Sequence, residues 1–166
     1  MGKRNNKVIL KLSGELFGED GQHINFEKYD LVAKQLIEIK KQSEAQIAIV
    51  VGGGNIFRGR QADSKVDHTE ADSMGMLATV INGIGLREAF IRNGSEDTRL
   101  MTAFNLPEIA EPYIKHKGLH HLEENRMVII AGGLGKPNFS TDSAVAQYAD
   151  ELKCRLILKA STVNGV

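Results

Sequence analysis

Residues 46–55 read QIAIVVGGGN, a short apolar and β-branched run that ends in three consecutive glycines. Such a run, bounded by glycine, is typical of a strand buried in a parallel sheet. Three glycines in a row carry an entropic cost, because glycine has the most backbone freedom to lose on folding. They are favoured where another group must approach the backbone closely. In α/β folds that group is often a phosphate, which binds backbone N–H groups beyond the carboxyl ends of the strands.

Two further stretches have the same form. KVILKL (7–12) runs into Ser13 and Gly14, and RMVIIA (126–131) runs into GGLG (132–135). Because the carboxyl ends of parallel strands meet at one edge of a sheet, the three glycine endings predict one site for a phosphate-rich ligand. Neither GxGxxG nor GxxxxGK[ST] occurs in the chain, which disfavours a Rossmann dinucleotide site and a P-loop.

The rest of the chain alternates between strand-like and helix-like patterns. Strands are predicted at 7–12, 46–51, 98–103, 126–133 and 154–160, and helices at 26–42, 71–92 and from Thr141 onward. This alternation predicts an α/β fold in which a mostly parallel sheet is sandwiched between helices. We expect a single domain over residues 1–166.

Two of the predicted helices carry more detail. In the helix at 26–42, apolar residues recur at helical spacing and predict its buried face; they are Leu31, Val32, Leu36 and Ile39. The helix at 71–92 contains Gly75, Gly83 and Gly85. Glycine is unfavourable inside a helix, so these three predict close packing against another element.

Length and composition are those of an ordinary globular domain. The chain has 166 residues, of which 42% are hydrophobic and 25% charged. Its 21 basic and 21 acidic residues balance, which argues against broad nucleic-acid or membrane-surface binding and makes any anion site local. The single cysteine, Cys154, excludes a disulfide within the chain, and the N-terminal apolar run is too short for a signal or membrane segment. We therefore expect a cytoplasmic protein.

Four charged residues lie beside the predicted loops: Lys11, Arg58, Asp72 and Asp142. A lysine in a buried strand is unfavourable unless it is paired or faces a ligand, whereas an exposed edge strand would leave Lys11 solvated. Arg58 could clamp a phosphate with its planar guanidinium, or lie solvated on the surface. Each aspartate could cap a helix, and Asp142 could instead orient a lysine or a metal-bound phosphate. The five histidines show no metal-ligand spacing.

Five segments carry a family resemblance. They are KLSGE (11–15), VVGGGNIFRG (50–59), ADSMGMLATVINGIGLREA (71–89), IIAGGLGKPNFSTDSA (129–144) and LILKASTVNGV (156–166). Together they resemble the bacterial uridylate (UMP) kinases of the amino acid kinase superfamily, from Lys7 to the last residue. GGGN alone is shared across that superfamily, whereas MGMLATVINGIGLREA (74–89) is specific to the uridylate kinases.

The resemblance implies transfer of the γ-phosphoryl group of ATP to UMP, giving UDP in pyrimidine nucleotide biosynthesis, with Mg²⁺ arriving on ATP and no metal ligands assigned to the protein. It implies catalytic roles for Lys11, Asp142 and Arg58. The implied ATP-binding positions are Lys11, Leu12, Ser13, Gly14, Gly54, Arg58 and Ser161. The implied UMP-binding positions are Gly53, Asp72, Leu134, Gly135, Lys136, Pro137, Asn138, Phe139, Ser140 and Thr141. Uridylate kinases are similar to one another in forming hexamers, so we expect a homo-oligomer, assembled through the helices at 26–42 and 71–92.

Some positions depart from the family pattern. Leu134 replaces a typical threonine, Lys136 and Asn138 alter a loop that usually reads GNPFF, and Asn164 replaces an aspartate. Family members also continue beyond the residue that matches Val166, where they complete the ATP pocket. From this resemblance we expect the 166 residues alone to bind UMP weakly and to show little or no kinase activity.

Two alternatives stay open. A catalytically silent nucleotide-binding or regulatory domain of the same fold would bind ligand without turnover, since a fold does not fix a function. A glutamate or acetylglutamate kinase would bind a carboxylate acceptor instead, although MGMLAT (74–79) and NFSTD (138–142) argue against it.

Overall fold

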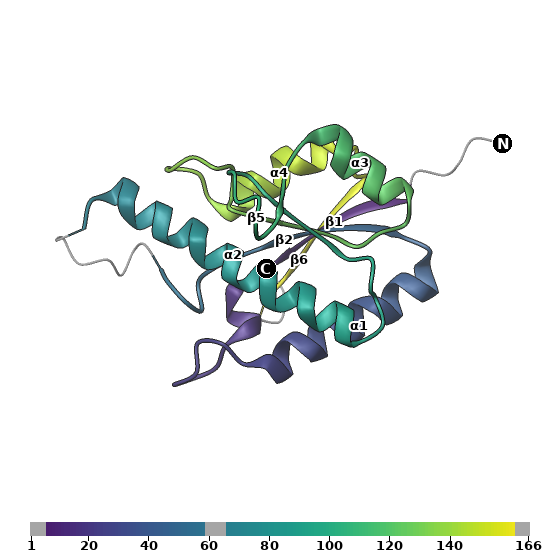
Figure 1. Ribbon diagram of the computed structural model, residues 1–166, viewed down its shortest axis with the longest axis horizontal. Helices are drawn as coiled ribbons and strands as arrows, with labels where there is room; N and C mark the ends of the chain where they lie inside the picture. Colours follow the sequence, from purple (N-terminus) through teal and green to yellow (C-terminus); the bar gives the residue numbers. More distant parts are fainter. Residues whose placement is uncertain (1–5, 59–65, 162–166) are drawn as a thin grey trace.

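The computed structural model describes residues 6–58 and 66–161, and over these residues a six-stranded sheet carries helices on both faces (Figure 1). The strands are β1 (Lys7–Leu12), β2 (Gln46–Val51), β3 (Arg99–Thr102), β4 (Glu111–Pro112), β5 (Val128–Ala131) and β6 (Leu156–Ala160). Their order across the sheet is β4-β3-β5-β2-β1-β6, and every neighbouring pair is parallel. The predicted α/β fold is confirmed. Asn164 lies outside the described residues.

The helices divide between the two faces of the sheet. They are α1 (Phe26–Ser43), α2 (His68–Arg92), α3 (Lys115–Glu123) and α4 (Thr141–Glu151), with a short 3₁₀ helix, η1 (Gly14–Phe17), after β1. α1 and α2 cover one face, and α3 and α4 cover the other (Figure 1). Alternate residues of β2 feed the two cores: Ile47 and Ile49 face α1 and α2, while Ala48 and Val50 face α3 and α4. Burial on both faces explains why β2 reads as a continuous apolar run.

α1 begins at the predicted residue, and its buried face is confirmed at Leu36 and at Val32, which packs against the core. It packs through Tyr29, Ala33 and Leu36, whereas Leu31 and Ile39 are 57% and 51% exposed. The predicted face was therefore wrong at these two positions. A tyrosine and an alanine carry a weak apolar signal in sequence, yet they fill the narrow space between α1 and α2.

α2 begins three residues earlier than predicted, after Asp67, whose side chain accepts the backbone N–H of Thr69. The prediction of close packing is confirmed at two of its glycines. A Cβ at Gly83 would lie 2.8 Å from Leu100, and a Cβ at Gly85 would lie 2.9 Å from the Tyr29 ring. α2 is long and apolar enough to cross a membrane by length and composition, but it lies on the sheet as a core helix.

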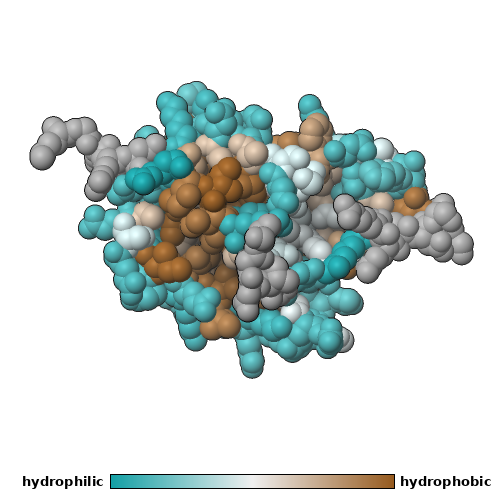
Figure 2. All heavy atoms as spheres, turned by 180° about the vertical axis from the view of Figure 1, so that it is seen from behind, coloured by the Kyte–Doolittle hydropathy of each residue, from teal (hydrophilic) through white to brown (hydrophobic). Residues whose placement is uncertain are grey.

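β6 lies at one edge of the sheet, beside β1. Its Leu156, Ile157 and Leu158 are 44–49% exposed. Seen from behind, the molecule carries a broad apolar patch ringed by hydrophilic residues, on the side where β6 lies (Figure 2). The predicted strand at 154–160 is confirmed from Leu156, and Cys154 before it packs, partly buried, against the core beneath α3 and α4.

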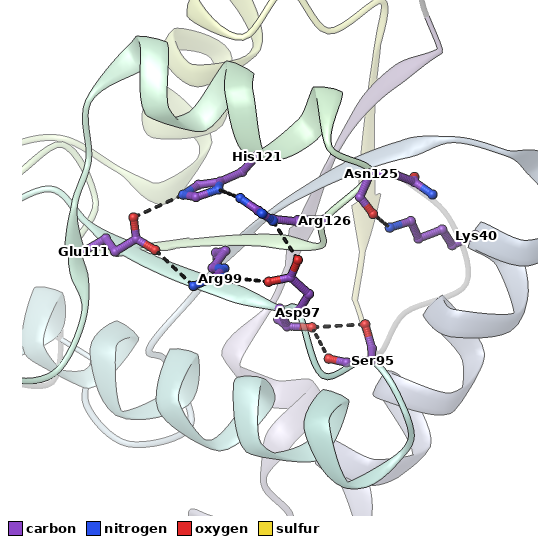
Figure 3. A network of polar contacts seen from close by, with 9 residues as sticks. Lys40, Ser95, Asp97, Arg99, Glu111, His121, Asn125 and Arg126 are labelled. Atoms are coloured by element: carbon purple, nitrogen blue, oxygen red, sulfur yellow. Dashed lines mark hydrogen bonds and ion pairs between the residues drawn. The ribbon is translucent and has the colours of Figure 1, made fainter.

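A polar network occupies the amino ends of the central strands, on the opposite edge from the glycine loops (Figure 3). The Asp97 carboxylate accepts hydrogen bonds from Arg99 and, at 2.7 Å, from Arg126. The Arg126 guanidinium thereby holds the pKa of Asp97 below its usual value. His121 lies between Arg126 and Glu111, 3.0 and 3.1 Å from them. These contacts join α3 to β4 and to the starts of β3 and β5.

Candidate active site

The loops that follow β1 and β2 are packed backbone against backbone. A Cβ at Gly14 would lie 2.5 Å from the backbone nitrogen of Gly54, and a Cβ at Gly52 would lie 3.0 Å from that of Gly14. A Cβ at Gly53 would meet α2, 2.8 Å from Ala78. Gly54 differs, because only the Arg58 side chain comes within 4 Å of its Cβ position. Packing thus requires three of these glycines, whereas at Gly54 a Cβ would meet only the flexible Arg58 side chain.

Lys11 lies on an interior strand, because β1 pairs with β2 on one side and β6 on the other. The reading as a solvated edge-strand lysine is therefore wrong. Its side chain is 14% exposed, and its ammonium nitrogen lies 3.3 Å from Asp142. The Lys159 ammonium lies 3.3 Å from the other carboxylate oxygen of Asp142. One carboxylate thus bridges two lysines where β1 and β6 end.

Asp142 lies in the first turn of α4, and its neighbour Ser140 is the N-cap. Its carboxylate is therefore free of the capping role. Partial burial acts to raise the pKa of Asp142, but the charge of Lys11 and hydrogen bonds from Lys159 and Lys11 outweigh it. The pKa is below its ordinary value, so the group is ionised at neutral pH. Two ammonium groups around one carboxylate leave a net positive charge that suits a phosphoryl group.

Sequence reasoning missed Lys159. The sequence does contain a feature that could have indicated it. LKAS (158–161), at the end of β6, has the same pattern as LKLS (10–13), at the end of β1. The sheet register places Lys159 directly opposite Lys11. That register depends on two strands almost the whole chain apart, so local pattern alone does not reveal it.

A cavity of about 220 Å³ lies between the glycine loop after β2, the start of α2 and the loop after β5, and Thr141, which precedes Asp142, is in its wall. The predicted nucleotide-binding residues that line it are Gly53, Gly54, Arg58, Asp72, Lys136, Phe139, Ser140 and Thr141. Leu134, Gly135, Pro137 and Asn138 are not among its lining residues. Phe57, Met76 and Thr79 line it without having been predicted.

Two of the residues outside the cavity wall shape the loop after β5. Leu134 packs against the core beneath α3 and α4. Asn138 has a left-handed backbone, with φ of 68°, and its N–H donates to the Asp72 carboxylate at 2.6 Å. Asp67, not Asp72, caps α2. Asp72 therefore ties α2 to this loop at the mouth of the cavity.

Arg58 is half-exposed yet engaged on two sides. Its Nε donates to the Gly54 carbonyl at 3.0 Å, and a terminal nitrogen pairs with Glu15. It lines both the 220 Å³ cavity and a second cavity of about 570 Å³ beside η1. The guanidinium thus lies where the KLSGE segment meets the triple glycine. A phosphate that entered there would compete with the Glu15 carboxylate for the Arg58 guanidinium.

The remaining predicted ATP-binding residues, Leu12, Ser13 and Ser161, lie in different surroundings. The Leu12 side chain is 2% exposed and packs in the core, and the Leu12 carbonyl accepts the N–H of Gly52 at 2.8 Å. The Ser13 N–H donates to the Ala160 carbonyl at 3.0 Å and joins the ends of β1 and β6. Ser161 follows β6 directly and is partly exposed. Over residues 6–58 and 66–161, no cluster of three or more histidine, cysteine or carboxylate side chains forms a metal site.

Comparison with known proteins agrees with the resemblance. The sequence profile of the amino acid kinase family matches residues 6–166. Uridylate kinases from two Mycobacterium strains, KMS and JLS, are each 42% identical over 162 residues, which are 97% of this chain and 64% of theirs. The chain thus spans 64% of the length of these curated relatives.

Solved structures give the same result. The crystal structure of UMP kinase from Bacillus anthracis has a TM-score of 0.91 and 36% identity, over 97% of this chain and 67% of that one. The UMP kinase of Ureaplasma parvum also has a TM-score of 0.91, with 32% identity over 98% and 72%. An isopentenyl phosphate kinase shares the fold alone, with a TM-score of 0.65 at 15% identity. The chain belongs to the amino acid kinase family and is a homologue of the uridylate kinases.

Proposed function

We propose that this chain carries the phosphoryl-transfer centre of a uridylate kinase, which moves the γ-phosphoryl group of ATP to UMP and releases UDP and ADP. The observation that carries the proposal is the bridge from Lys11 through Asp142 to Lys159 at the carboxyl edge of the sheet. Thr141, which precedes Asp142 in the chain, lines a cavity whose wall also includes Gly53, Gly54 and Arg58. The names of the uridylate kinase relatives support UMP as the acceptor, and the family resemblance implies ATP as the donor.

Phosphoryl transfer needs positioning and charge neutralisation more than covalent catalysis. In the proposed mechanism the UMP phosphate lies in the 220 Å³ cavity, against Gly54 and Arg58. One of its oxygens attacks the γ-phosphorus as the bond from that phosphorus to the β,γ-bridging oxygen breaks, and ADP leaves. Lys11 and Lys159 neutralise charge on the transferring group, and Asp142 holds them together. The ribose of UMP is placed near Asp72, whose carboxylate can accept hydroxyl hydrogen bonds.

Mg²⁺ enters this proposal as part of Mg-ATP. The ion commonly binds through substrate phosphates and one or two carboxylates, with water completing its shell. The only carboxylate described beside the lysines is Asp142, already shared by two ammonium groups, so the described residues fit an ion held mainly by the nucleotide. When bound, Mg²⁺ would offset negative charge on the ATP phosphates.

The test combines turnover with binding. Because the 166 residues alone are expected to show little or no turnover, UDP formation with ATP, UMP and Mg²⁺ is assayed in a full-length context, and UMP affinity is measured by calorimetry. UDP formation that disappears in Lys11→Ala supports the proposal in full. UMP binding without turnover supports the silent nucleotide-binding domain, and stabilisation by acetylglutamate but not by UMP supports an acetylglutamate kinase. Absence of both UMP binding and UDP formation overturns the proposal.

We also infer a cytoplasmic homo-oligomer with no nucleic-acid or membrane partner. The assembly is supported by the outer face of α2, where Met74, Leu77 and Ile81 recur at helical spacing and are 44–50% exposed. A row of large apolar side chains on one helix is a common subunit contact.

A further inference from the structure

Two buried polar side chains on α2 hold the two glycine loops that flank the cavity. Thr79 is 5% exposed and Asn82 is fully buried. They are three residues apart, so they lie on the same face of the helix. The Thr79 hydroxyl accepts the N–H of Gly132, after β5, at 2.7 Å. The Asn82 amide donates to the carbonyl of Gly52, after β2, also at 2.7 Å.

The Asn82 amide has a single possible orientation. The Gly52 carbonyl can only accept, so the Asn82 nitrogen must face it and the Asn82 oxygen must face Tyr29. The Tyr29 hydroxyl donates to that oxygen at 2.6 Å. Burial raises the pKa of Tyr29 to about 12, against a smaller lowering by Asn55, so the hydroxyl keeps its proton at neutral pH.

Asn55 completes the arrangement from within the glycine loop itself. It accepts from the Asn82 nitrogen at 2.7 Å and donates to the Asn82 oxygen at 3.2 Å. Every donor and acceptor of Asn82 is therefore used, and none can be lost without leaving a buried polar group unpaired. The same Asn55 lies against the loop after β1, since its side-chain oxygen would be 2.6 Å from a Cβ at Gly14.

The Thr79 hydroxyl is equally constrained. It donates to the Met76 carbonyl at 2.7 Å, which leaves it as an acceptor for Gly132. Gly132 has a φ of 86°, a conformation that favours glycine, and there the chain turns from β5 into the loop. From the other side of the sheet, the Tyr148 hydroxyl donates to the Gly133 carbonyl at 2.7 Å. Consecutive residues of this loop are thus held by helices of opposite layers.

We infer that Thr79 and Asn82 are positioning residues, which fix the distance between the loops after β2 and β5 and so align the backbone that meets the acceptor phosphate. This inference rests on the proposed function. The two residues that they hold, Gly52 and Gly132, directly precede Gly53 and Gly133, which line the cavity together with Thr79. If Thr79 and Asn82 only stabilised the fold, their replacement would lower thermal stability without any selective effect on the cavity. A positioning role also affects the loops and UMP binding, so measurements can separate it from a purely structural one.

Thr98 provides a matched control. It is 5% exposed, as Thr79 is, and its hydroxyl donates to the Ser95 carbonyl at 2.8 Å. It precedes β3, at the edge of the sheet where Ser95 lies in Figure 3, away from the glycine loops. Thr79→Val and Thr98→Val remove the same buried hydroxyl with little change of shape, and Thr79→Ser retains the hydroxyl.

The first measurement needs no ligand. Hydrogen exchange of the Gly132 amide, followed by NMR, should become at least about tenfold faster in Thr79→Val, because its acceptor is removed. Thr79→Ser and Thr98→Val should leave it near the wild-type rate. An unchanged rate in Thr79→Val overturns the inference.

The second measurement is UMP affinity by calorimetry. We expect about tenfold weaker binding in Thr79→Val and in Asn82→Asp, which loses both donors to the loop but keeps an acceptor for Tyr29. Thr98→Val should match Thr79→Val in thermal stability yet bind UMP normally. Equal affinities in the two valine variants would overturn the inference. If the wild-type chain binds no UMP, the proposed function fails, and the exchange rates alone then decide whether Thr79 holds the loop.

Discussion

Lys11 and Lys159 occupy opposite positions in the register of β1 and β6, and the Asp142 carboxylate lies 3.3 Å from each ammonium nitrogen. Like charges directly opposite each other on neighbouring strands repel. Asp142 offsets that repulsion and lets two cations share one small region. A transferring phosphoryl group, whose negative charge is spread over three oxygens, suits this pair, because both ammonium groups are held in place before the ligand arrives.

The first prediction concerns the two lysines. In a full-length context, Lys11→Ala and Lys159→Ala should each lower kcat far more than they raise the KM for UMP, because the charge that they neutralise develops on the transferring group. Steady-state kinetics with ATP, UMP and Mg²⁺ make the measurement. A normal kcat with a raised KM in both variants would show that the lysines serve binding alone.

The second prediction concerns Arg58. Its replacement by alanine should weaken UMP binding by about 1.5–3 kcal/mol, the range for a charge-assisted hydrogen bond. Arg58→Lys should recover only part of the affinity, since an ammonium lacks the planar fork. Glu15→Gln is the control, because it removes the partner that competes with phosphate for Arg58. Calorimetry in which Arg58→Ala binds UMP as tightly as the wild type would remove Arg58 from the site.

Much of the fold could be predicted from sequence because its strands are buried on both faces. β1 and β2 have the bounds predicted for them, because a short apolar run that ends at a glycine fits few structures other than a buried strand. β4 was missed because Glu111–Pro112 is a two-residue strand, too short to show the alternation of apolar and polar residues that marks a strand in sequence. The buried face of α1 was predicted only in part, because Tyr29 and Ala33 pack by shape, which hydrophobicity alone does not convey.

The residues of the candidate site were also predictable only in part. The glycines and Lys11 carry local signals, because each is out of place unless something approaches it. Lys159 acquires meaning only from the register of β6 on β1. Thr79 and Asn82 read as ordinary polar residues in an apolar helix, and their role depends on which loops cross that helix. Pairings between distant segments are what the sequence could not reveal.

The third prediction concerns the thiol of Cys154. Burial raises its pKa to about 11, against a smaller lowering by the charge of Lys7. The thiolate is the reactive form, so the native protein should react slowly with a thiol reagent at about pH 8 and quickly once unfolded in urea. Because the folded pKa is raised, the neutral thiol favours the folded state below its ordinary value of 9.0, and this contribution is lost as pH rises toward 11. The free energy of unfolding of Cys154→Ala should not show this loss of stability when it is measured between pH 9 and about pH 11. Rapid labelling of the native protein would contradict the assignment.

The last prediction concerns self-association through α2. Met74, Leu77 and Ile81 form a row on its outer face, 44–50% exposed. Burying that row against a second copy would remove apolar surface from water at roughly 25 cal/mol per Å². We expect light scattering at tens of micromolar to give at least a dimer, and Leu77→Lys to shift it toward monomer by placing a charge in the contact. Ile114→Lys is the matched control, because Ile114 is 47% exposed at the start of α3, on the other face of the sheet. A monomeric wild type, or equal shifts in both lysine variants, would exclude α2 as the contact.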